Sequence, residues 1–306
     1  MTIDIDHRQS HITHIFSTIA LLLFIIVNST MNIASAATGL VYPDVYKDYI
    51  KFLNNRSPYK LTDFSGAHSR RDVVEIVLFL QALQMGGYHQ PLMIETFIIQ
   101  YRRALIQISN GKNDTLLGSV WLSDVSSKTD SFYISDIVIP KRKFIAGFYT
   151  LKHRVNEINI QKTEDIEQYK AICNPSWTVD YILLKELNAN CINASRWEFM
   201  IKMLGAERGD FLLAPFQPTE DMILNTHGIS LAPIKNIKTN LLDDRVFIVS
   251  KKTKNGKELF AALQRGIKIL KSKKLFTKAY TESGFYNNKV KKWRMLEPIS
   301  KSLVDY

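Results

Sequence analysis

The residues best suited to bind a small molecule lie in short loops just before predicted helices. The first loop is Ser65–Arg71, where Ser65, His68 and Arg70 precede an apolar helical segment. Backbone N–H groups and the helix dipole favour an anion at such a position. The alternative role is structural, with Ser69 capping the helix and the arginines solvated. The sequence leaves both roles open.

Two further loops and one strand end supply the other candidate binding residues. These are Ser119, Trp121, Asn174, Ser176, Trp177 and Phe216. The ring of Trp121 could stack on a ring or sugar, or pack between parts of the protein. Ser176 could cap the next helix or bind a ligand oxygen, and Phe216 could form a far wall or belong to the core.

Catalytic patterns are weak in this chain. His68 is the only His in these loops, and Ser65-Gly66 lacks the flanking glycines of a hydrolase elbow. An acid–base pair would have to join His68 to Glu95 or Asp124, and no spacing supports it. We therefore expect a binding protein without cofactor rather than an enzyme.

Two cysteines, Cys173 and Cys191, stand 18 residues apart. Neither has metal-ligand spacing to a His, so we expect no zinc site. A disulfide and two buried thiols are both compatible with the sequence.

The elements that position these loops alternate between strand and helix. Predicted strands in the first half are Tyr59–Phe64, Leu92–Phe97 and Thr115–Gly118. Predicted helices there are Tyr42–Leu53, Arg70–Met85 and Tyr101–Ile108. This alternation is typical of a parallel α/β sheet, which binds ligands beyond the C-terminal ends of its strands.

A similar unit follows in the second half. Its predicted strands are Tyr169–Cys173, Asp210–Ala214 and Arg245–Ser250, and its predicted helices are Thr178–Leu187, Ser195–Leu204, Gly256–Leu270 and Lys274–Ser283. Ser69–Asp72 and Ser195–Glu198 have the spacing of capping boxes. Phe144–Thr150 and Arg245–Ser250 are predicted to connect two α/β halves.

The first 36 residues have the features of an export signal. Ile19–Val27 is an apolar run too short to span a bilayer, and Ala34-Ser35-Ala36 resembles a cleavage site. An uncleaved membrane anchor is the alternative. We expect a periplasmic protein that begins at Ala37, and export makes a nucleic-acid partner improbable.

Charge and length narrow the class further. The net charge is +11 over 306 residues, and the densest cations, Lys268–Lys278 and Lys289–Arg294, are on C-terminal helical segments. A solvated helix face is the simplest explanation, and an anionic ligand or surface is the alternative. The length allows two lobes of about 120 residues each.

Three motifs in the order Ile106–Gly118, Phe132–Val138 and Gly209–Ala214 support a family assignment. In this order they resemble the core of type 2 periplasmic solute-binding proteins, especially the branch with the family 3 amino-acid receptors. The segments DFSGAHSRRDVVEIVLFLQALQMGG, VWLSD and DFLLAPF also look like a divergent subgroup of exported proteins from Gram-negative bacteria.

The resemblance implies a two-lobed α/β fold with two mixed sheets, flanked by helices and joined by two hinge strands. It places a signal peptide at 1–36, an N-terminal extension at 37–58, lobe one at 59–146 plus 250–306, and lobe two at 151–245. It also implies a monomer that delivers its ligand to an inner-membrane transporter or a sensor kinase.

The chain departs from the receptor pattern at two points. Amino-acid receptors usually bind the α-carboxylate with an Arg shortly after the third strand, where this chain has only Lys128. A lysine cannot make the bidentate pair of an Arg with a carboxylate. The usual Asp for the α-amino group is replaced by Ala214-Pro215-Phe216. We therefore expect a small polar or anionic ligand, and the alternative is a sensory or interaction module whose cleft is degenerate.

Overall fold

The computed structural model describes residues 36–298. The predicted leader, with its apolar run Ile19–Val27, lies outside the described residues. Seven α-helices are present in the described part of the chain, and each begins within two residues of a predicted start: α2 Pro43–Leu53, α3 Arg71–Met85, α4 Tyr101–Ser109, α5 Thr178–Glu186, α6 Trp197–Gly205, α7 Gly256–Ser272 and α8 Leu275–Glu282. Helix α6 begins at Trp197, two residues after its predicted start.

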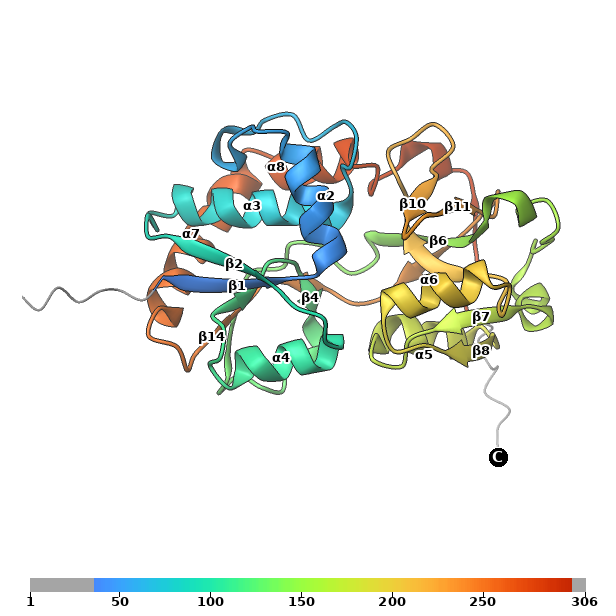
Figure 1. Cartoon of the computed structure of the whole chain (residues 1–306), viewed down its shortest axis with the longest axis horizontal. Coiled ribbons are helices and arrows are strands. Elements are labelled where there is room, and N and C mark those ends of the chain that lie inside the picture. The colour runs from blue at the N-terminus through green and yellow to red at the C-terminus, as the bar shows by residue number, and fades with distance from the viewer. Residues whose placement is uncertain (1–35, 299–306) are drawn as a thin grey trace, which may run out of the picture. The chain divides into compact units, whose positions relative to one another are not determined.

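The first sheet has five strands in the order β2-β1-β3-β14-β5. They are β2 Leu92–Thr96, β1 Ala37–Val41, β3 Thr115–Leu116, β14 Ile248–Ser250 and β5 Phe132–Ile134. Strand β1 runs parallel to β2 and β3, whereas β14 is antiparallel to β3 and β5. Helix α4 lies on one side of this sheet, and α2, α3 and α8 lie on the other (Figure 1).

The strand predicted at Tyr59–Phe64 is wrong. Pro58–Lys60 is a 3₁₀ turn, and the side chain of Gln81 donates hydrogen bonds to the carbonyls of Pro58 and Leu61. A side chain therefore satisfies backbone acceptors that would otherwise need a neighbouring strand. Strand β1 lies between β2 and β3 instead, where a Cβ at Gly39 would lie 2.7 Å from the side chain of Leu117.

The second sheet is antiparallel around one long strand, β6 Phe144–Leu151. Its other strands are β9 Leu212–Pro215, β10 Leu224–Thr226, β11 Ile229–Pro233, β12 Ile237–Leu241 and β15 Arg294–Met295. Strand β6 pairs with β9, β11 and β12, so the segment predicted as a connection also forms the middle of this sheet.

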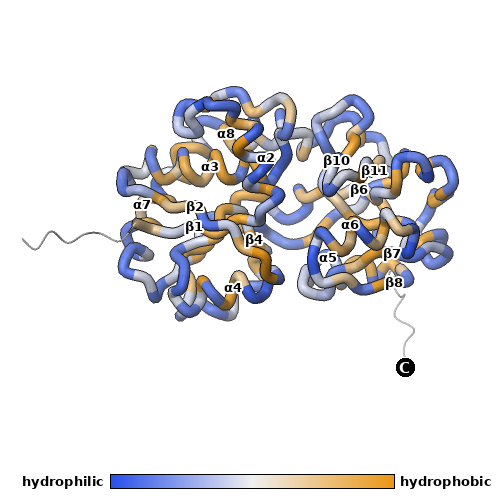
Figure 2. The backbone as a smooth tube through the Cα atoms, in the orientation of Figure 1, coloured by the Kyte–Doolittle hydropathy of each residue, from blue (hydrophilic) through white to orange (hydrophobic). Residues whose placement is uncertain are grey.

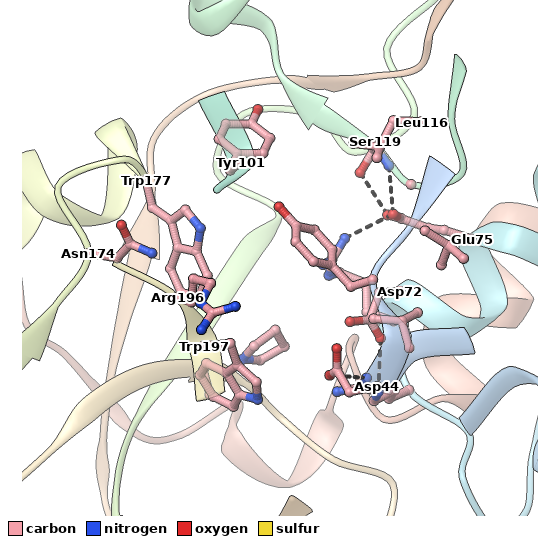
Figure 3. Close-up of a pocket in the computed structure, with 18 of the residues that line it drawn as sticks. Asp44, Asp72, Glu75, Tyr101, Leu116, Ser119, Asn174, Trp177, Arg196 and Trp197 are labelled. Atoms are coloured by element: carbon pink, nitrogen blue, oxygen red, sulfur yellow. Dashed lines mark hydrogen bonds and ion pairs between the residues drawn. The ribbon is translucent and has the colours of Figure 1, made fainter. Parts of the chain in front are cut away.

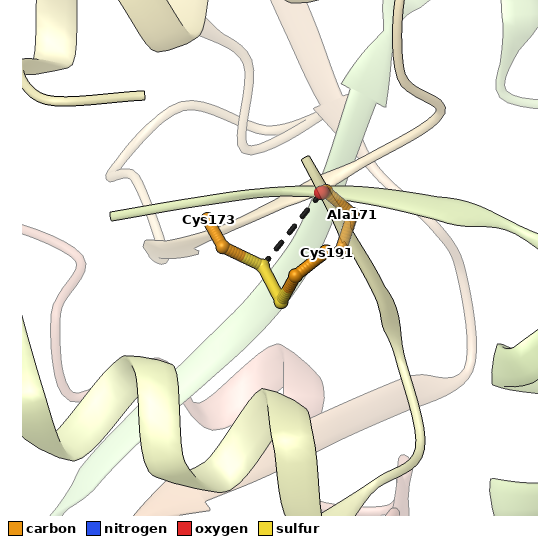
Figure 4. Close-up of a disulfide and its surroundings, with 3 residues drawn as sticks. All are labelled: Ala171, Cys173 and Cys191. Carbon is orange, nitrogen blue, oxygen red and sulfur yellow. Dashed lines mark hydrogen bonds between the residues drawn. A yellow bond between two sulfur atoms is a disulfide. The ribbon is translucent and has the colours of Figure 1, made fainter. Parts of the chain in front are cut away.

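Two short strand pairs complete the fold. The parallel strands β7 Lys170–Cys173 and β8 Asn190–Asn193 are joined by a disulfide between Cys173 and Cys191 (Figure 4), which settles the open question about these cysteines. Strands β4 Val120–Trp121 and β13 Arg245–Val246 are antiparallel.

The chain passes between the two sheets at 135–143, at 242–247 and again between α8 and β15. The lobe boundaries given above stay a prediction, and the strand pairing adds that β1 lies in the first sheet and β15 in the second. Near β15, the buried ammonium group of Lys238 donates to the carbonyls of Val290 at 2.6 Å and Lys291 at 3.0 Å.

Helix α3 forms the centre of the largest core cluster and is apolar on nearly every face (Figure 2). It crosses α7 at very short range. A Cβ added at Gly86 would lie 1.8 Å from the Ala262 carbonyl oxygen, and one added at Gly266 would lie 1.8 Å from the Ala82 carbonyl oxygen. Glycine is therefore required at both positions.

In residues 36–298, no helix is long and apolar enough to cross a membrane.

Candidate functional site

A pocket of about 400 Å³ is surrounded by the N-terminal ends of five helices. The first residues of α2, α3, α4, α5 and α6 all contribute to its lining (Figure 3). Aromatic side chains form much of the wall: Tyr42, Phe97, Tyr101, Trp121, Phe144, Trp177 and Trp197. Because helix N-termini carry partial positive charge, their convergence favours an anion.

Arg245 is a buried cation in the lining of this pocket. Strand β13 places it opposite Trp121 on β4, and the residue is only 9% exposed. Its Nε donates to the hydroxyl of Ser119 at 2.7 Å, and its Nη2 donates to the Ser119 carbonyl. The guanidinium lies 4.4 Å from the ring centroid of Trp121 and 5.5 Å from that of Phe144.

No carboxylate lies within ion-pair distance of Arg245 in the described residues. Burial, and then the neighbouring charge of Arg71, lower the pKa of its guanidinium. A desolvated cation without a counter-ion is unfavourable, so an anion in the pocket would stabilise it.

Arg71, by contrast, is paired. Its Nη1 donates to Glu75 at 2.9 Å, and the fully buried Glu75 also accepts from the N–H and hydroxyl of Ser119 and from Tyr280. Burial lowers the pKa of Arg71, but Glu75 and Asp72 outweigh this effect and the net pKa is raised. The Nε of Arg71 has no hydrogen-bond partner in the described chain.

Arg70 is neutralised more completely. Its guanidinium forms ion pairs with Asp44 at 2.9 Å, Asp72 at 3.2 Å and Asp48 at 3.3 Å. Although burial lowers its pKa, these carboxylates raise it overall. Arg70 therefore lines the pocket with its charge neutralised by three carboxylates, although its Nε makes no hydrogen bond within the described residues.

The opposite wall is aromatic. Trp177 precedes α5 and Trp197 begins α6, and their rings are stacked with centroids 6.2 Å apart. The indole N–H of Trp197 donates to the hydroxyl of Thr226 at 3.2 Å. Both rings point toward the pocket with Arg196 beside them (Figure 3).

Asp180, in the first turn of α5, also lines the pocket, and its charge interacts with that of Arg245. Desolvation raises its pKa to about 6, although Arg245, a hydrogen bond from Trp121 and Arg71 act in the lowering direction. Its protonation state therefore changes in the mildly acidic range.

Comparison with known proteins identifies the fold. The chain matches no protein-family model and no curated protein. Among solved structures, it resembles the amino-acid ABC transporter substrate-binding protein AbpA of Streptococcus pneumoniae bound to L-arginine, with 16% identity, a TM-score of 0.51 and coverage of 81% of this chain and 95% of that one. The substrate-binding protein of another amino-acid ABC transporter gives 14% identity, a TM-score of 0.51 and coverage of 81% and 99%.

The chain has the type 2 periplasmic binding protein fold. Its two α/β lobes, with two mixed sheets and connecting strands, agree with the architecture expected from the sequence. The low identities fit a divergent member of this fold.

On this fold, the structure brings together five of the predicted binding residues. Arg70, Ser119, Trp121, Asn174 and Trp177 all line the pocket. Their hydrogen-bonding groups are partly used within the protein, since the Ser119 hydroxyl contacts both Glu75 and Arg245 and the side-chain oxygen of Asn174 accepts from the Ser176 N–H.

Four predicted residues do not line this pocket. Ser65 donates to Asp63, and His68, exposed and at a φ of 62°, contacts Asp48. Ser176 is partly buried outside the lining, and Phe216 packs against Tyr149 and Trp293.

Both predicted capping boxes are wrong. The N-caps of α3 and α6 are Arg70 and Arg196, and neither makes a side-chain cap. The Ser69 hydroxyl donates inward to the Phe64 carbonyl, and Glu198 pairs with Lys202 along its own helix. Local alternative partners thus replace the reciprocal capping bonds.

The sequence interpretation missed Arg245, Asp180 and Trp197 as pocket residues. Arg245 reaches the pocket only because β13 pairs with β4, more than 120 residues upstream. The one local signal was the charged residue directly before an apolar strand. Lys128, which replaces the usual receptor arginine in sequence, does not line the pocket.

The considered acid–base pairs do not meet in this pocket. Neither His68 nor Glu95 nor Asp124 lines it, and the two carboxylates accept from Asn113 and Tyr101 respectively. No group of three or more potential metal ligands is found in the described residues.

Proposed function

We propose that this chain is a periplasmic solute-binding protein without enzymatic activity that captures a small anionic ligand between its lobes. The observation that carries the proposal is the buried guanidinium of Arg245, which has no carboxylate partner in the described chain. A carboxylate or similar anion can accept two parallel hydrogen bonds from such a group.

Other features of the pocket support the same ligand class. Five helix N-termini surround it, and the Nε of Arg71 is also free of a hydrogen-bond partner in the described residues. The Trp177–Trp197 wall offers apolar area for the remainder of the ligand. A small acid with a planar or apolar body fits these surroundings better than a sugar.

In this proposal the ligand acts by stabilising one arrangement of the lobes. It would contact Arg245 on the first side and Trp177 on the second, so that its binding energy favours the closed state. A transporter or a sensor kinase in the inner membrane would then recognise that state. The solute-binding protein is proposed to act as a monomer.

The alternative of a degenerate cleft receives less support. The pocket has room for a ligand of about 400 Å³ and is lined by Trp121 and Arg70. A sensory module that binds no ligand would not need an open pocket with a buried cation that lacks an ion pair in the described residues.

The test is a thermal-shift and calorimetric screen of the mature protein against carboxylates, phosphate esters, sugars and polyamines. We expect an anion at a hundred times its Kd to raise Tm by roughly 5–10 °C. Arg245→Met should abolish that shift, whereas Arg208→Met, at an exposed position, should leave it intact.

Two results would overturn the proposal. One is stabilisation by polyamines or neutral sugars with no response to any anion. The other is an anion whose affinity is the same for the Arg245→Met variant and the wild type.

A further inference from the structure

The positive charge of this protein is concentrated in one segment. Residues 251–294 contain 14 Lys and Arg against two Glu, a net charge of +12, whereas residues 36–250 have a net charge of +1. Of this excess, +8 lies in residues 251–282, which contain α7 and α8, and +4 lies in residues 289–294, next to the second sheet. None of these residues lines the ligand pocket.

Lysines on α7 lie along one exposed side of the helix. Lys257, Lys268 and Lys271 are within about 60° of one another around the helix axis and extend over roughly 21 Å along it. The opposite side packs into the core through Leu259, Leu263 and Ile267. The burial of that side fixes the lysines toward solvent.

More exposed lysines lie just before α7, just after it and on α8. The set, called the lysine face below, comprises Lys252, Lys254, Lys257, Lys268, Lys271, Lys273, Lys274 and Lys278. All are exposed, and only Lys278 forms an ion pair in the described structure, with Glu282 at 2.8 Å. The acidic residues nearby include Glu258 on α7, Asp136, which donates through its N–H to Gln264, and Asp63, whose charge acts on Lys278.

The composition of the lysine face distinguishes between two kinds of anionic partner. Protein interfaces are enriched in Arg and aromatic anchors and depleted in Lys. No large exposed hydrophobic residue is found between 251 and 298, and Arg265 is occupied by the carbonyl of Gly86. Lysines are flexible point charges that need no matching shape, so they suit a diffuse anionic surface.

We propose that the lysine face binds the anionic phospholipid surface of a membrane, independently of the ligand pocket. Lysines near such a surface contribute additively, and the attraction is screened by salt. This contact would keep the protein close to a membrane in both its free and its ligand-bound state.

The test is co-sedimentation of the mature protein with two kinds of vesicle. One contains phosphatidylcholine alone, and the other contains in addition about 30% of the anionic lipid phosphatidylglycerol. We expect binding to the anionic vesicles only, and loss of binding in about 0.5 M NaCl. The variant Lys257→Gln/Lys268→Gln/Lys271→Gln should lower the partition coefficient roughly a hundredfold, about fivefold for each lysine.

The matched control is Lys141→Gln/Lys143→Gln/Lys152→Gln. It removes three exposed lysines without ion pairs outside the lysine face and should bind nearly as the wild type does. Gln and Lys have similar helix propensity, and an unchanged urea midpoint would show that each variant is folded.

Three outcomes would overturn the proposal. They are no binding to anionic vesicles, equal losses for both triple variants, and binding to soluble polyglutamate but not to vesicles. The last would identify an acidic protein as the partner instead.

Discussion

Among single residues, two arginines show how burial and ion pairing determine which cation can interact with a ligand. Arg70 was recognisable from its loop, but three carboxylates saturate it. Arg245 gives little local signal, yet in the described chain it is a buried cation of the pocket with no carboxylate within ion-pair distance. Two of the three partners of Arg70, Asp44 and Asp48, come from α2, so the sequence alone could not tell which arginine was free.

Asp180 should make stability depend on pH. Its pKa in the folded protein is about 6, above the ordinary value of 3.8, so folding favours its protonated form. Its contribution is therefore complete below about pH 4 and is lost as the pH rises through about 6. We expect Asp180→Asn to become progressively more stable than the wild type over this range and to keep a constant advantage above it.

Urea unfolding of both proteins at intervals between pH 4 and 8 measures this difference. A difference in unfolding free energy that does not change with pH would contradict the assignment. Asp130→Asn, at an exposed loop position, serves as the control and should show no such trend.

At the scale of elements, the crossing of α3 and α7 depends on glycine. Helical periodicity predicted both helices, but not how closely their backbones approach. Periodicity reports which side of a helix is buried, whereas the closeness depends on Gly86 and Gly266 facing Ala262 and Ala82.

Gly266→Ala should therefore destabilise the protein, even though alanine favours helix by about 1 kcal/mol. The new Cβ would lie 1.8 Å from the Ala82 carbonyl, and separating the helices should cost about 1–3 kcal/mol net. Urea unfolding measures the change. As a control, Ala261→Gly at an exposed position of α7 should cost about 1 kcal/mol from helix propensity alone. A Gly266→Ala variant that is more stable than the wild type would contradict the close crossing of α3 and α7.

The disulfide between β7 and β8 belongs to the same scale. The sequence left it open because β8, Asn190–Asn193, is short and polar and does not read as a strand. Its parallel pairing with β7 brings the two cysteines together.

We expect Cys173→Ala/Cys191→Ala to lose about 3 kcal/mol of unfolding free energy, since the bridge closes a loop of 18 residues. Thermal unfolding with and without a reductant checks this. Reductant should lower the Tm of the wild type and leave the double variant unchanged, and an equal response of both would contradict the expectation.

At the scale of the whole molecule, the sequence predicted the helices and the two-lobed α/β class because both follow from local periodicity. It failed where distant pairing decides. Strands β1, β12 and β15 join segments far apart in the chain, and several strands of the second sheet are too short to show alternation. The pocket was predicted in part for the same reason, since its loops carry local signals but Arg245 does not.

The buried ammonium of Lys238 makes the second sheet depend on residues 290–295. The side chain is held by the carbonyls of Val290 and Lys291, and β15 follows immediately to pair with the strand that carries it. A copy shortened by an early stop or a protease before residue 290 would leave a charged amine facing an apolar layer. We therefore expect a chain that lacks these residues to be less stable than the intact protein.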